Sequence, residues 1–173
     1  MTTQTLTQKP ASNRLSTQDD KRLLSSKIKK GMPLYRYKGL KESSMEDIYS
    51  CAYNLYTSKK YEQALNLFRG MAVYNHIDKR VWMGIGACNQ ILQQYNKAIA
   101  AYFYATLLDA DDPLPLFYSV ECHLALKNYP QALAALEVIK HILEEKPECK
   151  VSRERAEEMR GMIEQGMQEN HKK

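Results

Sequence analysis

The strongest constraint on the fold is a repeat with a period of 34 residues. Five kinds of position recur at that spacing, each occupied by residues of similar character. The five sets are Tyr61, Tyr95 and Tyr129; Ala64, Ala98 and Ala132; Phe68, Tyr102 and Leu136; Ile48, Trp82 and Leu116; and Ala52, Gly86 and Val120. A unit of this length leaves an apolar face uncovered, so we expect neighbouring units to stack on one another.

This spacing is the tetratricopeptide pattern, in which each unit is a pair of helices folded back on each other. Small residues at Ala52 and Ala64 let the paired helices approach closely, and the large residue at Phe68 wedges against the next pair. We therefore predict an all-α fold, with three tetratricopeptide repeats in a short right-handed solenoid, an N-terminal helical arm and a C-terminal capping helix. The predicted segments are 1–20, a disordered tail; 21–42, a basic helical arm; 43–147, the repeats, at about 45–78, 79–112 and 113–146; and 148–170, the capping helix.

Local signals mark where the solenoid should begin and end. Residues that favour helix N-termini precede each predicted repeat. They are Ser43 or Ser44, with capping-box spacing to Glu46 or Asp47; then Asp78; and then Asp112, which Pro113 follows. After Pro147, apolar residues recur at steps of three and four, at Ala156, Met159, Ile163 and Met167. This spacing predicts an amphipathic helix that closes the open end of the solenoid.

Composition and charge narrow the function classes. The chain has 173 residues, enough for one domain with a real core. Its net charge of +5 is uneven, because residues 1–41 hold ten basic and two acidic side chains while 42–173 hold fifteen and eighteen. We expect no membrane span and no secretory signal, and hence a protein that stays in the cytoplasm where it is made. A transit peptide is the alternative, since the first 18 residues contain no acid.

We find no pattern typical of catalysis, metal binding or a cofactor. The four histidines have no metal-ligand spacing, and no phosphate-binding glycine loop or serine elbow is present. The cysteines, Cys51, Cys88, Cys122 and Cys149, form no Cys-x-x-Cys pair. Cys88 and Cys122 share one repeat position, as small packing residues would, which favours structural thiols in a reducing compartment. We predict that the protein is not an enzyme and needs neither cofactor nor metal.

The basic arm has three interpretations. Its apolar residues, Leu23, Leu24 and Ile28, suit a helix that docks on a partner or on a second copy of the chain. A solvated basic helix is the plainer alternative. The many lysines and arginines beside Tyr35 and Tyr37 also suit nucleic acid. No nucleic-acid-binding fold surrounds them, so no nucleic-acid partner is expected.

The first repeat helix has two apolar faces rather than one. Ile48, Cys51, Ala52 and Leu55 form the face expected to pack on the partner helix, while Tyr49, Tyr53 and Tyr56 form a second stripe. A helix that is apolar on two faces must be covered on both, and the second face should point into the concave surface of the solenoid. Tyrosine offers a large ring and a hydroxyl that can bond a peptide backbone. The predicted groove residues are Tyr49, Tyr53, Tyr56, Met83, Ala87, Gln90, Leu114, Phe117, Glu121 and Leu124. Alternatively, the capping helix or the arm fills this surface.

Three segments resemble one family in more detail than the general repeat pattern requires. They are EDIYSCAYNLYTSKKYEQALNLF, GIGACNQILQQYNKAIAAYFYA and VECHLALKNYPQALAAL. They are similar to the class II chaperones of bacterial type III secretion, which escort hydrophobic pore-forming translocators, and the resemblance covers about residues 21–163. It departs from the family in the stretch KKGMPLYRYKGL, where many relatives have a glycine pair and a short second helix.

The resemblance implies a non-enzymatic cytoplasmic protein that forms dimers through its N-terminal helical region. It implies a concave groove that holds an extended segment near the client's N-terminus, with the aromatic groove positions matching Tyr49, Tyr53 and Tyr56. The implied partners are hydrophobic translocators, a second copy of the chain and, in some relatives, a transcription activator. A general scaffold that reads C-terminal peptide tails is the rival. Such modules clamp a carboxylate with Lys and Asn, where this chain has Tyr49, Tyr53 and Gly84.

Overall fold

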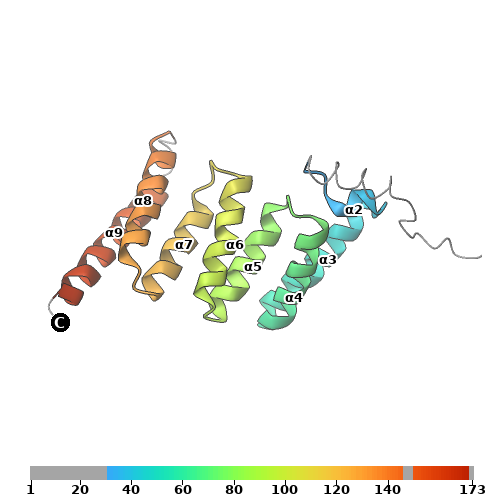
Figure 1. The fold of residues 1–173 in the computed structure, drawn as a ribbon, viewed down its shortest axis with the longest axis horizontal. Helices are drawn as coiled ribbons and strands as arrows, with labels where there is room; N and C mark the ends of the chain where they lie inside the picture. The colour runs from blue at the N-terminus through green and yellow to red at the C-terminus, as the bar shows by residue number, and fades with distance from the viewer. Residues whose placement is uncertain (1–30, 146–149, 172–173) are drawn as a thin grey trace, which may run out of the picture. The chain divides into compact units, whose positions relative to one another are not determined.

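The computed structural model describes residues 31–145 and 150–171, and its helices are labelled α2 to α9 (Figure 1). Their bounds are α2 Leu34–Tyr37, α3 Glu42–Thr57, α4 Tyr61–Tyr74, α5 Lys79–Ile91, α6 Tyr95–Leu108, α7 Leu114–Ala125, α8 Tyr129–Glu144 and α9 Lys150–His171. These described residues contain no strand. The predicted tail and the predicted dimerisation residues Leu23, Leu24 and Ile28 lie outside them, as does Cys149.

From α3 onward the helices pack mainly on their neighbours in the chain (Figure 1). α3 pairs with α4, α5 with α6 and α7 with α8, and each pair also packs on the next. The predicted all-α solenoid of helix pairs is therefore confirmed. The first helix of every pair ends alike, because Lys59, Gln93 and Lys127 take positive φ angles of 60°, 58° and 57°. Such a left-handed residue lets the following amides bond the last carbonyls of the helix.

Where two paired helices meet, a smaller side chain on the first helix accompanies a larger side chain on the second. The first helix contributes Ala52, Gly86 or Val120, and the second contributes Phe68, Tyr102 or Leu136 to the same regions of the core. The smallest residue faces the largest, since a Cβ added at Gly86 would lie 2.4 Å from Cε1 of Tyr102. Close packing of protein interiors requires this compensation. The glycine is thus needed for its lack of a side chain.

Two local predictions for the first repeat are wrong. α3 begins at Glu42 with Lys41 at its N-cap, so Ser43 and Ser44 lie inside the first turn rather than at the cap. Ile48 and Cys51 are exposed, although they were expected to pack. Their counterparts in the second repeat, Trp82 and Ile85, join a core cluster that also contains side chains of α4. The described residues contain no helix pair before α3 that could cover Ile48 and Cys51 in the same way.

The later helix starts follow the prediction more closely. Asp78 is the N-cap of α5, where its side chain accepts a hydrogen bond of 3.0 Å from the amide of Arg80. Asp112 accepts one of 2.9 Å from the amide of Leu114, and Pro113 lies at the start of α7. At the other end, α9 buries Met159 and Ile163 against the third repeat. α9 therefore closes the solenoid as an amphipathic helix.

Candidate binding groove

A cavity of about 850 Å³ runs along the first helices of the three pairs. Eight of the ten predicted groove residues line it: Tyr49, Tyr53, Tyr56, Met83, Ala87, Gln90, Leu114 and Glu121. They come from α3, α5 and α7. Because the helix pairs stack, the corresponding faces of these three helices line the same cavity. The cavity is also lined by Phe68, Lys79, Arg80, Gly84, Ile91, Tyr95, Tyr102, Tyr118 and Ala125.

The other two predicted residues, Phe117 and Leu124, do not line this cavity. Phe117 is 2% exposed and belongs to a cluster that includes Met159 and Ile163 of α9, against which Leu124 also packs. α9 thus covers Phe117 and Leu124, whereas Leu114 and Glu121 of the same predicted face stay in the cavity beside Tyr118 and Ala125. The capping helix therefore covers part of the predicted surface in the third repeat and leaves the predicted residues of the first two repeats in the cavity.

Aromatic rings form the end of the groove on the first repeat. The rings of Tyr49 and Tyr53 stack with their centroids 6.4 Å apart, and Tyr49 meets Phe68 edge-on at 5.8 Å. The guanidinium of Arg80 lies 4.6 Å from the centre of the Tyr49 ring. Burial raises the pKa of Tyr49 and of Tyr56, so both keep their hydroxyl hydrogens. Tyr53 remains 52% exposed, with its ring accessible in the cavity.

A row of polar side chains crosses the middle of the groove. The hydroxyl of Tyr102 donates to Oε1 of Gln90 at 2.7 Å, and Nε2 of Gln90 donates to Oε2 of Glu121 at 2.8 Å. Arg155 of α9 donates from Nη2 to Oε1 of Glu121 at 2.6 Å. Burial raises the pKa of Tyr102 far above its ordinary value, which keeps this tyrosine a donor. Four helices, α6, α5, α7 and α9, each contribute one member of the row.

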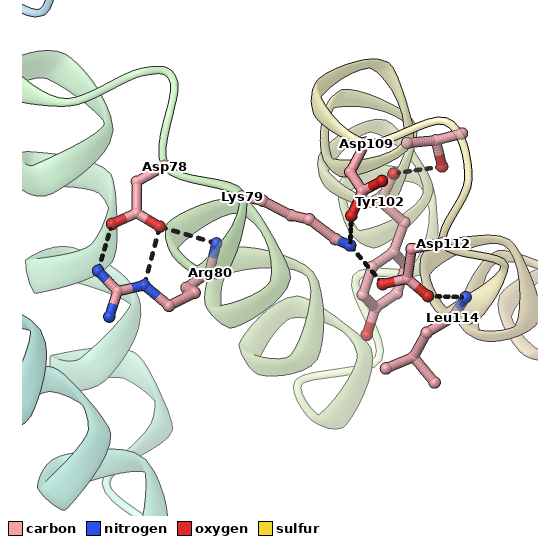
Figure 2. Close-up of polar contacts among 8 residues, drawn as sticks. Asp78, Lys79, Arg80, Tyr102, Asp109, Asp112 and Leu114 are labelled. Carbon is pink, nitrogen blue, oxygen red and sulfur yellow. Dashed lines mark hydrogen bonds and ion pairs between the residues drawn. The ribbon is translucent and has the colours of Figure 1, made fainter.

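The cationic residues on the groove rim are paired with acids. Figure 2 shows Lys79 reaching from the start of α5 to Asp109 and Asp112 in the loop before α7. Arg80 binds Asp78 of its own cap at 2.8 Å and also binds Glu46 of α3 at 2.6 Å. The hydrogen bonds that Arg80 donates to Glu46 and to Asp78 raise the pKa of Arg80. The two cations of the rim are thus neutralised by four acids, which disfavours a clamp for a ligand's carboxylate.

Some groove residues were missed although the sequence carries a signal for them. Lys79 and Arg80 lie one helical turn before Met83, so extending the Met83–Ala87 stripe backward would have found both. Tyr118 and Ala125 each follow a residue that was predicted, Phe117 and Leu124, and those two pack with α9 instead. Tyr102 was assigned to packing between the helices. Its ring does pack there, and its hydroxyl reaches the groove beyond.

Reactive groups near the groove are held in unreactive states. Burial raises the pKa of the Cys88 thiol to about 11 and that of Cys122 to about 12. Burial also lowers the pKa of His123, whose Nδ1 has no hydrogen-bond partner in the described part of the chain. Within the same described ranges, no three potential metal ligands gather in one place and no helix is long and apolar enough to cross a membrane. The arrangement is suited to binding an apolar chain rather than to transforming it.

The fold and groove define the class of the protein: a tetratricopeptide-repeat protein with an apolar, aromatic concave surface. The tetratricopeptide repeat family model matches residues 45–76. Low calcium response locus protein H of Yersinia pseudotuberculosis is 33% identical over 134 residues, which are 78% of this chain and 80% of that protein.

Solved structures extend the comparison. The Yersinia enterocolitica type III secretion chaperone SycD, in complex with a peptide of the translocator YopD, has a TM-score of 0.66 and 34% identity, covering 72% of this chain and 95% of SycD. PcrH of Pseudomonas aeruginosa, in complex with the chaperone-binding region of PopB, has a TM-score of 0.64 and 30% identity, covering 70% and 98%. The chain belongs to the family of type III secretion translocator chaperones. These relatives have a non-enzymatic role, in agreement with the prediction that the chain is not an enzyme.

Proposed function

We propose that this protein is a cytoplasmic chaperone that binds an extended N-terminal segment of hydrophobic translocators in its groove. Binding masks apolar client surface and keeps the clients soluble and apart before export, with one client segment held per groove. We also propose that the chaperone acts as a homodimer. The observation that carries the proposal is the stripe of Tyr49, Tyr53 and Tyr56, which remains after the solenoid has packed and which lines a cavity of about 850 Å³.

The electrostatics of the rim favour this function over a scaffold that reads C-terminal tails. A free carboxylate needs an available cation, whereas Lys79 and Arg80 are each bound by two carboxylates. Large, partly exposed rings instead favour apolar side chains, with hydroxyls left to bond the peptide main chain. The sequence match to chaperones whose structures hold YopD and PopB segments supports the same choice.

The test is the binding of a fluorescently labelled PopB chaperone-binding region to the full chain, measured by anisotropy. Tyr53→Ala should weaken binding about tenfold or more, because a large ring in an apolar site is typical of a binding hot spot. Tyr104→Ala is the matched control. Tyr104 is 51% exposed and Tyr53 is 52% exposed, but Tyr104 does not line the groove. Circular dichroism should be unchanged for both variants. Equal affinities for the two would contradict the proposed site.

A further inference from the structure

The polar row in the groove depends on a residue that does not line the groove. Tyr102, Gln90 and Glu121 all line the main cavity, whereas Arg155 lies in α9 and lines a neighbouring cavity of about 420 Å³ beside Leu114. Arg155 is held from two sides. Its guanidinium lies 4.7 Å from the ring centre of Phe117 and 5.6 Å from that of Tyr118, and it donates to Glu121.

The direction of every hydrogen bond in the row follows from Glu121. A carboxylate only accepts hydrogen bonds, so Gln90 must turn its NH₂ group toward Glu121 and its carbonyl oxygen toward Tyr102. Without the carboxylate, the amide of Gln90 could rotate by half a turn and still bond the tyrosine hydroxyl. Arg155 occupies the other oxygen of Glu121 and balances its charge. Arg155 of α9 thus acts on the orientation of Gln90 through Glu121.

We propose that Arg155 is a positioning residue of the groove: by fixing Glu121 it fixes Gln90, so that the row presents a constant donor to the main chain of a bound segment. This inference rests on the proposed function and adds α9 to the binding site. One N–H of the Gln90 amide bonds Glu121, and the amide carries a second N–H that can bond a ligand carbonyl.

The chemistry of the ligand makes such a donor necessary. An extended segment brings peptide N–H and C=O groups with it, and burying them unbonded is costly. Apart from the tyrosine hydroxyls and the paired ions of the rim, the rest of the groove is mainly aromatic and aliphatic and offers few partners for peptide groups. A fixed donor at Gln90 therefore favours a segment that is extended at that point. It also selects register, because the ligand must place a carbonyl opposite the amide.

The experiment compares Arg155→Met with Arg160→Met in the full chain. Arg160 lies on the same helix and binds Glu137 of α8 at 2.5 Å, outside the groove, so it controls for the loss of an ion pair that ties α9 to the repeats. With the labelled PopB region, we expect Arg155→Met to weaken binding about tenfold, because a charge-assisted bond orients the donor. Arg160→Met should change binding less than about twofold. Arg155→Lys should recover part of the loss.

Two further measurements separate positioning from a purely structural role. If Arg155 acts through Glu121, the double variant Arg155→Met with Glu121→Gln should bind no more weakly than the weaker single variant. In the free chain, the side-chain amide protons of Gln90 should have NMR chemical shifts displaced from those of an exposed glutamine and should exchange slowly with water. We expect Arg155→Met to move those shifts toward the exposed values and to speed the exchange with water, and Arg160→Met to leave both as they are. Unchanged Gln90 signals in Arg155→Met would overturn the inference.

The outcomes distinguish this inference from the proposed function. If Tyr53→Ala loses binding while Arg155→Met binds like the wild type, the groove is the client site but α9 has no part in it. If the wild type binds none of the PopB region, the proposed function fails for this client, and the Gln90 signals still decide whether Arg155 orients the row. Additive losses in the double variant would also contradict positioning through Glu121.

Discussion

The second and third repeats share one register but use it differently. In the second, Gly86 leaves room for Tyr102, whose hydroxyl passes between the helices and reaches Gln90 in the groove. In the third, Val120 and Leu136 fill the corresponding space and offer no polar group. The second repeat also leaves Met83 in the groove, whereas α9 covers its counterpart Phe117.

This difference separates what builds the solenoid from what builds the site. Any pair of side chains with a suitable combined volume satisfies the core, so Gly with Tyr and Val with Leu serve equally well there. Only the first combination delivers a hydroxyl to the concave surface. In the second repeat, one residue therefore both fills the core and places a hydroxyl in the groove, whereas the third repeat gives part of its concave face, at Phe117, to contact with α9.

The largest effect should come from forcing the second repeat to resemble the third. Gly86→Val places a branched side chain where even a Cβ would lie 2.4 Å from the Tyr102 ring, so we expect a loss of at least about 3 kcal/mol in the free energy of unfolding. Adding Tyr102→Leu should recover roughly half of that loss in urea denaturation, because the pair then matches Val120 and Leu136.

The control is the same substitution where no neighbour restricts it. Gly70 in α4 has no atom within 4 Å of an added Cβ, so Gly70→Val should change stability by less than about 1 kcal/mol. If the double variant is no more stable than Gly86→Val alone, the volume of the pair does not explain the two repeats.

The second-largest loss of stability should come from weakening the contact between α9 and the third repeat. Ile163 of α9 is fully buried against the third repeat, and Ile163→Ala should cost about 2–4 kcal/mol in urea denaturation through lost burial and the cavity left behind. Met162 is its neighbour on the same helix and is 61% exposed, so Met162→Ala should cost less than about 0.5 kcal/mol. Similar costs for both would mean that α9 is not anchored on this face.

The comparison of the second and third repeats shows how much of the fold and of the candidate site the sequence predicts. The 34-residue register correctly predicted the helix pairs and named eight residues of one cavity, because both depend on spacing along the chain. In α7 the register assigned Phe117 and Leu124 to the groove in place of Tyr118 and Ala125, because Phe117 is covered by α9, some forty residues further on. The exposure of Ile48 has a similar cause, since it depends on what precedes the first pair. The polar row depends on side-chain direction, which spacing does not encode.

Where the two repeats carry the same residue at the same buried position, we expect that residue to have the same reactivity. Cys88 and Cys122 occupy equivalent buried positions, and burial raises their pKa values to about 11 and about 12. At pH 8 we expect iodoacetamide to modify either one about a hundredfold more slowly than the exposed Cys51, measured by peptide mass spectrometry. A raised thiol pKa contributes stability below the ordinary value near 9, and this contribution is lost as the pH rises through 11 and 12. Rapid modification of only one buried thiol would show that the two repeats open independently.

The smallest effect should come from the ion pairs that only the second repeat can make. Lys79 binds Asp109 and Asp112, which precede the third repeat. The third repeat has Pro113 at the position of Lys79, so it cannot make the same ion pairs. Lys79→Met should cost less than about 1 kcal/mol, because partly exposed ion pairs are weak in water. At 1 M salt the difference from wild type should largely vanish, since the Debye length falls to about 3 Å. A cost above about 2 kcal/mol that persists in salt would contradict this and would make the acid–lysine cluster a determinant of how the third repeat sits on the second.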